Sequence, residues 1–143
     1  MTIAKLIAGR SGDVWSCHAE DCVADAVEVL AKKRIGALPV EDAGTAVAGI
    51  FSERDVLYCL QAHGADALRM KVRDVMTAPV ISVAPRDSVL QALSLMTRRR
   101  IRHLPVVENG RMVAFISIGD LVKHRLDSIE AEAEAMRSYI QSA

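Results

Sequence analysis

The amino-acid sequence contains an internal duplication. Residues 34–40 read R-I-G-A-L-P-V, and residues 100–106 read R-I-R-H-L-P-V. A second phrase follows each of them: G-I-F-S-E-R-D at residues 49–55 and A-F-I-S-I-G-D at residues 114–120. One unit of about 60 residues buries too little surface to be secure alone, so we expect two similar units that share a core. Further matches in the same register are Asp21 with Asp87, Val23 with Val89, Ala26 with Ala92, and Leu30 with Met96.

The first half of each unit predicts a strand followed by a helix. Short apolar segments at residues 14–17 and 80–83 indicate the strands. Helices are predicted over about 22–34 and 88–100, because apolar residues recur there at spacings of three and four. Asp87 and Ser88 both suit the N-cap position of the second helix.

The second half of each unit predicts a β-hairpin and another helix. The hairpin strands are expected at 38–41 with 47–51 in the first unit, and at 104–107 with 112–116 in the second. Asn109-Gly110 is a strong signal for a tight hairpin turn. The Ser of the S-x-x-D phrase then begins a helix. Each unit is therefore predicted to be β-α-β-β-α, which makes the fold class α+β with two tandem repeats.

These elements predict a single module over residues 1–143. Repeat one is expected at about 8–62, repeat two at about 72–126, and a C-terminal helical extension at about 127–143. In the last part of the chain, apolar residues recur at spacings of four and three, which is a heptad stripe. We expect this stripe to pack on a second subunit, with packing inside the monomer as the alternative. The stripe consists of Val122, Leu126, Ile129, Ala133, Met136 and Ile140.

Composition narrows the possible partners. Lys plus Arg number 18, as do Asp plus Glu, so no net field attracts nucleic acid, and aromatic residues make up only 3% of the chain. We therefore expect no nucleic-acid partner, despite the basic run at residues 98–102, which is as well explained by a solvated helix end. No apolar run approaches the roughly 20 residues of a membrane span, and the N-terminus does not look like a signal peptide.

The cysteines and the catalytic motifs bear on metal binding and enzyme activity. Cys17, Cys22 and Cys59 form no C-x-x-C pair and suit buried thiols in a reducing cytoplasm. A zinc site of Cys17, His18 and Cys22 is conceivable by spacing, although no metal site is our expectation. The chain has no H-E-x-x-H motif, P-loop or nucleophile–base pattern, so we expect no enzyme activity.

The duplicated phrases resemble a known family. A D-V-M-T lead-in at residues 74–77 and the tandem R-I-x-x-L-P-V and S-x-x-D phrases resemble a cystathionine beta-synthase (CBS) domain pair, the Bateman module. The resemblance covers about residues 5–123. It implies two repeats packed sheet to sheet with pseudo-twofold symmetry, two clefts between them, and flat homodimers. It also implies an adenosine ligand, AMP first and otherwise ADP, ATP, NAD(H) or S-adenosylmethionine. We expect a free-standing module, with no catalytic cofactor, that regulates a protein the sequence does not identify.

The resemblance also implies roles for particular residues. It places the ribose of a ligand on Asp55 in one cleft and on Asp120 in the other, with Ser52 and Ser117 beside the phosphates. The adenine is expected against the small Gly36-Ala37 backbone or its counterpart in the opposite repeat. Because Arg102-His103 replaces this neutral pair in repeat two, the Asp120 cleft is expected to be the better phosphate site. Arg54 is a candidate cation for the Asp55 cleft.

A simpler interpretation of the S-x-x-D phrase is a helix cap. Ser at the N-cap and an acidic residue at the third helical position resemble a capping box, although Glu or Gln is the usual partner there. Such a cap contributes about 1 kcal/mol and needs no ligand. The two interpretations are compatible, and the duplication favours a phrase that does both. Repeat two also has Ala114 in place of the usual Gly, which is expected to crowd the backbone.

The sequence is compatible with three kinds of function. The first is a non-enzymatic sensor that binds an adenine nucleotide between its repeats and changes the surface that a partner meets. The second is a structural or protein-interaction module whose clefts hold no physiological nucleotide. The third, an enzyme, has no support from any catalytic pattern.

Overall fold

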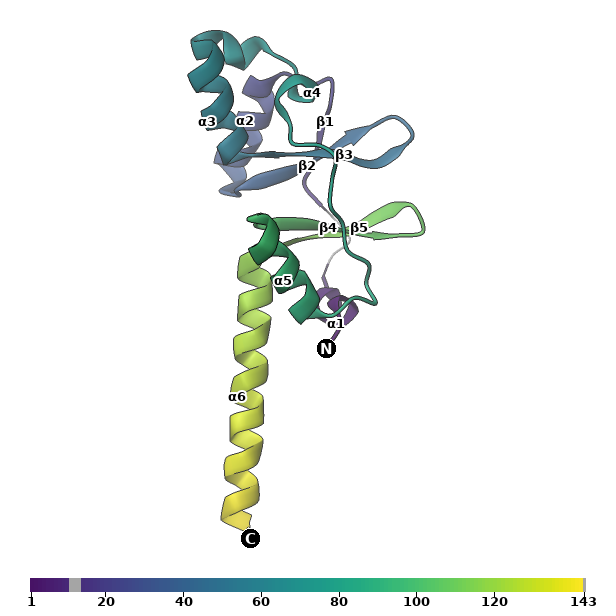
Figure 1. Ribbon diagram of the computed structural model, residues 1–143, viewed down its shortest axis with the longest axis vertical. Helices are drawn as coiled ribbons and strands as arrows, with labels where there is room; N and C mark the ends of the chain where they lie inside the picture. The colour runs from purple at the N-terminus through teal and green to yellow at the C-terminus, as the bar shows by residue number, and fades with distance from the viewer. Residues whose placement is uncertain (11–13, 143) are drawn as a thin grey trace.

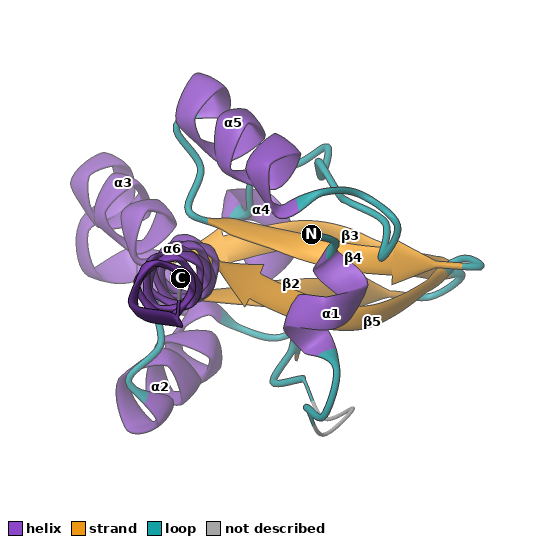
Figure 2. Ribbon diagram, turned by 90° about the horizontal axis from the view of Figure 1, so that it is seen from below, coloured by secondary structure: helices purple, strands orange, loops and turns teal. Residues whose placement is uncertain are grey.

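Two small β-sheets lie one above the other at the centre of the molecule, and each carries its helices on its outer side (Figures 1 and 2). This computed structural model describes residues 1–10 and 14–142. The sheet of the first repeat contains three strands in the order β1-β2-β3, and that of the second contains β4 and β5. The predicted α+β fold of two stacked repeats is therefore confirmed.

The first repeat follows the predicted order of elements. Its elements are β1 (Cys17–His18), α2 (Val23–Lys33), β2 (Ala37–Asp42), β3 (Thr45–Ser52) and α3 (Glu53–His63). β2 pairs antiparallel with β3, so that Leu38 lies opposite Phe51, and β1 adds to the other edge of β2 in parallel. A 3-10 helix, η1 (Gly64–Arg69), and the short helix α4 (Val72–Val75) lead to the second repeat.

The second repeat has the same arrangement without its first strand. Its elements are α5 (Val89–Arg99), β4 (His103–Glu108), β5 (Arg111–Ser117) and α6 (Ile118–Ser142). The predicted hairpin turn is present, with Asn109 and Gly110 both at positive φ, 52° and 75°. Helix α6 is unbroken over 25 residues, so the heptad stripe continues the last helix of the repeat and projects away from the body of the molecule (Figure 1).

The two predicted first strands are much shorter than expected. Instead of residues 14–17, β1 comprises only Cys17 and His18. Instead of a strand at 80–83, only Val83 pairs, through backbone hydrogen bonds with Pro105 and Val107 beside β4. Cys17 and Val83 are matched positions of the two repeats, and each is buried against the central hairpin of its own repeat. Cys17 and Val83 thus hold their segments against the hairpins. The other apolar residues of the two segments do not extend the sheets.

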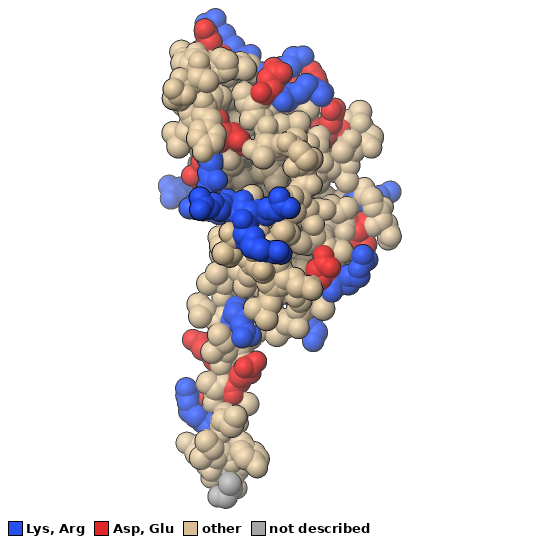
Figure 3. Space-filling model, in the orientation of Figure 1, with Lys and Arg blue, Asp and Glu red and all other residues tan. Residues whose placement is uncertain are grey.

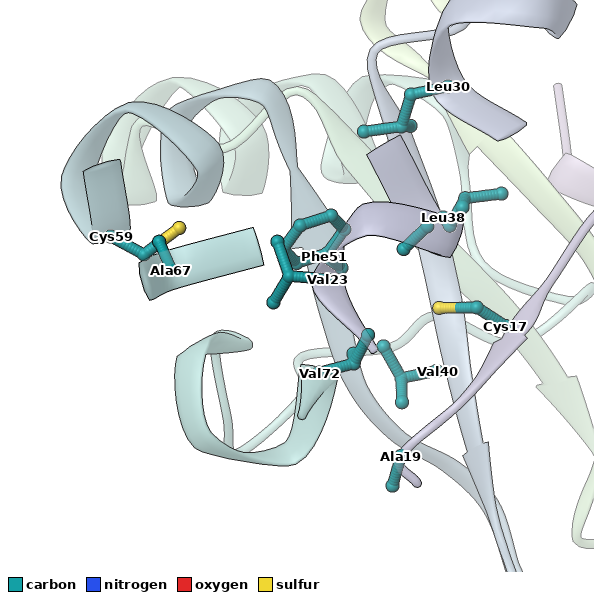
Figure 4. Packing of buried hydrophobic residues seen from close by; sticks show 11 residues of the cluster. Cys17, Ala19, Val23, Leu30, Leu38, Val40, Phe51, Cys59, Ala67 and Val72 are labelled. Carbon is teal, nitrogen blue, oxygen red and sulfur yellow. The ribbon is translucent and has the colours of Figure 1, made fainter. Parts of the chain in front are cut away.

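Each repeat has its own core, so the prediction of one core shared by both repeats is wrong. Leu38, Val40 and Phe51 are fully buried in the first repeat and pack with Val23 of α2 and Val72 of α4. Figure 4 shows this cluster between the strands and helices of the first repeat. The matching residues of the second core are Leu104, Val106, Ile116 and Val89. Because side chains alternate along a strand, the L-P-V phrase directs its Leu and Val to the same buried face.

The short helix before each repeat packs on the other repeat. Helix α1 (Ile3–Ile7) joins the second core through fully buried Ile3, whose N–H donates to the carbonyl of Asp87 at 2.8 Å. In the same way, the N–H of Val72 in α4 donates to the carbonyl of Asp21 at 2.8 Å in the first repeat. Asp21 and Asp87 are matched positions. The two lead-in helices are therefore exchanged about the pseudo-twofold axis, which ties the repeats into one module.

Candidate functional site

Both S-x-x-D phrases form helix caps. At the start of α3, the Asp55 N–H donates to Ser52 Oγ at 3.3 Å, and the Ser52 N–H donates to Asp55 Oδ2 at 2.9 Å. At the start of α6, the corresponding distances between Ser117 and Asp120 are 3.1 and 2.9 Å. Asp is short, but it reaches its partner in both copies. The cap interpretation is confirmed, and it uses one oxygen of each carboxylate.

The other carboxylate oxygen of Asp55 is also occupied. The hydroxyl of Thr77 donates to Asp55 Oδ1 at 2.9 Å, and the Ser52 hydroxyl donates a further bond to Oδ2 at 3.1 Å. Asp55 is only 8% exposed. Since a buried carboxylate is stable only when it is hydrogen-bonded, these donors account for its burial without any ligand.

The segment that carries Thr77 closes over the first repeat. Thr77 and Ile50 of β3 exchange two backbone hydrogen bonds, at 2.9 and 3.0 Å. This close approach requires Gly49, because a Cβ there would lie 2.6 Å from Met76 Sδ and 3.0 Å from the Thr77 carbonyl oxygen. The Gly of the first phrase therefore makes room for the lead-in to the second repeat.

The Asp120 carboxylate has a different environment. Its Oδ1 faces Nη2 of Arg10 at 3.3 Å, and about one third of each side chain is exposed. Counted from the matched residues Ile3 and Val72, the position of Thr77 falls on Ala8, which has no hydroxyl to offer. The backbone takes a left-handed conformation at Gly9, with φ at 82°. In the described part of the chain, no bridge to β5 matches that between Ile50 and Thr77.

A cleft of about 280 Å³ opens beside Asp120. Both repeats contribute to it: Ser117, Asp120 and His103 come from repeat two, whereas Ala37 belongs to β2 of repeat one. Ala114 also lines the cleft. Among the described residues, no bridge joins the first lead-in to β5 as Thr77 is joined to Ile50, so this part of β5 has room for the Ala114 side chain. The remaining lining residues are Ile7, Arg10, Val14, Trp15, Ile35, Val113 and Phe115.

His103 is held firmly in this cleft. Its ring stacks on Phe115 with centroids 5.4 Å apart and planes 12° from parallel. Across the pseudo-twofold axis, a Cβ on Gly36 would lie 3.5 Å from His103 Cε1. Burial lowers the pKa of His103, and Arg102 lowers it further, whereas Asp120 and Glu53 act in the opposite direction. The ring is therefore neutral near pH 7 and titrates at lower pH.

The structure brings some of the candidate residues together and separates others. Ser117, Asp120, His103 and Ala37 line one cleft, and Gly36 borders it through His103. Arg102 does not line the cleft; its side chain is exposed, and its carbonyl accepts from the N–H of Ile118. Ser52 and Asp55 form a separate group around Thr77.

Arg54 turns away from the Asp55 carboxylate. Its Nη1 donates to the carbonyl of Arg100 at 3.4 Å, at the C-terminal end of α5. Basic side chains from both repeats meet there, and Figure 3 shows a band of Lys and Arg across the middle of the molecule. The candidate cation of the first cleft therefore bridges the two repeats.

Several residues of the cleft carry no signal in the duplicated phrases. Arg10, Val14 and Trp15 come from the start of the first repeat, at and before its first strand, where the two copies share little sequence. Trp15 is 58% exposed, and Lys33 Nζ lies 3.8 Å from the centre of its ring. Neither lead-in segment carries a sequence signal for this placement, which follows from the exchange of lead-ins seen in the structure.

Neither a metal-binding cluster nor a membrane-spanning helix is found among the described residues. Burial, aided by Asp21 and Glu41, raises the pKa of the Cys17 thiol to about 12, which opposes the thiolate that a zinc ion needs. No group of three or more His, Cys, Asp or Glu side chains in residues 1–10 and 14–142 is placed to hold a metal. In the same residues, no helix combines the length and apolarity of a membrane span.

Comparison with known proteins identifies the family. The CBS domain model matches twice, at residues 11–62 and 72–127, so the chain belongs to the CBS domain family. It is 39% identical over 140 residues to the mitochondrial CBS domain-containing protein CBSX3 of Arabidopsis thaliana, covering 93% of this chain and 68% of that protein. The chain spans only 20–38% of several other curated relatives, among them an inosine-5'-monophosphate dehydrogenase from Mycobacterium leprae.

Solved structures show the same fold. The CBS-domain protein ATU1752 from Agrobacterium tumefaciens is 36% identical, with a TM-score of 0.81 over 87% of this chain and 92% of that one. CBSX2, whose crystal structure is a complex with AMP, is 26% identical, with a TM-score of 0.75 over 88% of this chain and 96% of that one. The predicted resemblance to CBS domain pairs is therefore confirmed.

Proposed function

We propose that this protein is a regulatory module that binds an adenosine compound in the Asp120 cleft and performs no catalysis of its own. One observation carries the proposal. Of two matched carboxylates, Asp55 has both oxygens bonded to hydroxyl and backbone donors of the protein. Asp120 uses one oxygen in its helix cap, and its other oxygen borders a cleft and pairs with a partly exposed arginine. The relative CBSX2 has been crystallised with AMP, which favours AMP as the first candidate and leaves ADP, ATP and NAD(H) as further ones.

The chemistry of the cleft suits the three parts of a nucleotide. Oδ1 of Asp120 can accept hydrogen bonds from the ribose hydroxyls once Arg10 turns aside, and such charge-assisted bonds are strong. The displaced guanidinium then lies near the phosphate, as do the Ser117 hydroxyl and the His103 ring. Ala37 and Ile35 offer an apolar surface for the adenine. Arg10 thus takes the role first expected for Arg102.

A panel of ligands tests this proposal. Nucleotide-stripped protein is heated with adenosine, AMP, ADP, ATP, NAD(H) and S-adenosylmethionine. A ligand at 100 times its Kd stabilises the folded state by about 2.7 kcal/mol, which is readily detected as a rise in Tm. Asp120→Asn should abolish the rise while keeping an oxygen for the cap. The matched control, Asp55→Asn, should start from a lower Tm and keep the full ligand response.

Arg10→Gln separates the phosphate role from the rest of the cleft. The affinity of the Arg10→Gln variant for AMP should fall. Its affinity for adenosine, which has no phosphate, should stay the same or rise. A protein that responds to no member of the panel would instead be an interaction module with no nucleotide ligand. That second function has its own support, since large apolar side chains on α3 are exposed, Leu57 by 67% and Tyr58 by 64%.

We infer that the module works as a homodimer, as the flat dimers of the family imply, and that ligand binding favours one arrangement of the dimer. We also infer a reducing compartment, the cytoplasm, since all three cysteines are free.

A further inference from the structure

Helix α6 presents an uncovered apolar face. Only Leu121, in its first turns, is buried, and beyond the contact with α5 the helix stands clear of the described body of the molecule (Figure 1). Leu126 is 55% exposed, Met136 61% and Ile140 65%. A single helix of this kind is marginally stable in water, because helices in proteins depend on packing of their apolar face. We therefore expect the exposed apolar stripe of α6 to pack against a partner.

The stripe has coiled-coil geometry. In a heptad written abcdefg, Leu126, Ala133 and Ile140 occupy the a positions. Val122, Ile129 and Met136 occupy the d positions. All of them except Ala133 are substantially exposed large apolar side chains. The small Ala133 in the central layer allows two such helices to approach closely.

The charges beside the stripe select one orientation for a pair of these helices. In a parallel, in-register pair, each g residue lies next to the e residue of the partner's following heptad. Arg125 would then meet the partner's Glu130, and Glu132 would meet the partner's Arg137, so both pairs attract. Figure 3 shows that the projecting helix carries side chains of both signs.

The antiparallel arrangement brings like charges together. There, e residues face e residues and g residues face g residues. With the stripes aligned, Glu130 would face the partner's Glu130, Glu132 would face the partner's Glu132, and Lys123 would face the partner's Arg137. Like charges at these positions disfavour pairing, so the pattern distinguishes the two orientations.

We propose that α6 pairs with α6 of a second copy of this chain as a parallel, in-register two-stranded coiled coil. The occupant of the apolar face is thus a second copy, chosen by charge complementarity. The pair would place both globular bodies at the same end of the coil. With fewer than three heptads, the coil is short, and the association is expected to be reversible and dependent on concentration. The proposal does not depend on ligand binding, and its test uses nucleotide-free protein.

Charge reversal tests the pairing by sedimentation of the full chain. Glu132→Arg places like charges opposite each other at two symmetric sites, and the dimer Kd should rise by about fivefold or more, given the usual strength of such pairs. The double variant Glu132→Arg/Arg137→Glu restores opposite charges in the parallel pair and should recover most of the original Kd. The recovery is partial because Arg137→Glu also removes the exposed ion pair of Arg137 with Glu134 in the same helix, at 2.9 Å, and such pairs contribute little. Asp127→Arg, the same charge change at the outward b position, is the matched control and should leave the Kd unchanged.

Cross-linking tests the orientation. Ile140→Cys should give a disulfide between the two copies under mild oxidation, because equal a positions adjoin only in the parallel coil. In the antiparallel pair, Ile140 would face the partner's Val122, and the two Ile140 positions would lie about 27 Å apart at 1.5 Å per residue. Ser138→Cys, on the opposite face, is the control and should give no link. A monomeric protein, a dimer that the double variant does not rescue, or a dimer without the Ile140→Cys link would each overturn the proposal.

Discussion

The hydroxyl of Thr77 lies 2.9 Å from Oδ1 of Asp55 and completes the hydrogen bonding of a buried carboxylate. Thr77 belongs to the lead-in of the second repeat, whereas Asp55 begins the last helix of the first. At the matched carboxylate of Asp120, the corresponding lead-in supplies Arg10 at 3.3 Å instead. Two sites of common origin have thus diverged, one into a structural contact and the other into an open cleft.

The Thr77 contact predicts a difference in stability between the two sites. Thr77→Val removes the donor to Asp55 and leaves a buried oxygen unpaired, so the free energy of unfolding should fall by about 1–2 kcal/mol. The comparison variant Arg10→Gln breaks a partly exposed ion pair and should cost no more than about 1 kcal/mol. Urea unfolding of both variants measures the difference. Equal losses would mean that the two carboxylates are equally dependent on their partners.

The glycine of the first phrase gives a second prediction. Gly49→Ala would bring a Cβ within 3.0 Å of the Thr77 carbonyl oxygen and closer still to Met76 Sδ, so the lead-in must shift. Overpacking of this kind should lower the free energy of unfolding by about 1–3 kcal/mol.

The matched control for that variant is Ala114→Gly. Ala114 occupies the same place in β5 and, although it borders the cleft, is only 6% exposed and belongs to the second core. Its loss should therefore cost about 1–2 kcal/mol, the usual difference between Ala and Gly in an element interior together with one buried methyl group. Thermal or urea unfolding compares the two. A Gly49→Ala protein as stable as the parent would show that the lead-in yields at no cost.

His103 predicts a pH dependence of stability and of binding. Burial holds its folded pKa below its ordinary value of 6.5, so the unfolded chain binds more protons as the pH falls through that value. The stability that neutral His103 contributes is therefore present above about pH 6.5 and is lost on acidification, and His103→Gln should flatten this slope. Unfolding midpoints between pH 5 and 8 measure it.

A phosphate beside His103 should reverse this effect. An anion favours the imidazolium, so AMP binding near pH 6 should take up protons at the His103 ring. Calorimetry in buffers of different ionisation enthalpy measures this uptake. The His103→Gln variant corrects for the phosphate's own titration. Identical proton uptake in both proteins would place the phosphate away from this ring.

The sequence predicted those features that depend on local pattern. The duplicated R-I-x-x-L-P-V phrase gave the central hairpin of each repeat, since alternating Leu and Val fix the buried face and Asn109-Gly110 fixes the turn. Both helices α2 and α5 were found within one or two residues by their apolar spacing. Ser117, Asp120, His103 and Ala37 line one cleft, whereas Arg102, which was expected beside them, does not, and the binding of a ligand there stays a prediction.

The features that were missed depend on contacts between distant segments. Residues 14–17 read as a strand, but only Cys17 and His18 find a pairing partner, because pairing is decided by the neighbouring strand rather than by local composition. Arg54 lies within the motif, yet it bonds to the distant Arg100 carbonyl. Arg10 and Thr77 acquire their roles through the exchange of lead-ins, which has no signature in either segment alone.

The continuity of α6 has a mechanical consequence. Asp120 lies in the first turn of a helix of 25 residues, so the wall of the cleft and the far end of the helix form one rigid rod. At 1.5 Å per residue, this rod is about 37 Å long, and a tilt of about 10° at its base moves its tip by about 6 Å. A small movement at the base of the helix, such as one that follows release of Arg10 from Asp120, is therefore amplified at the far end.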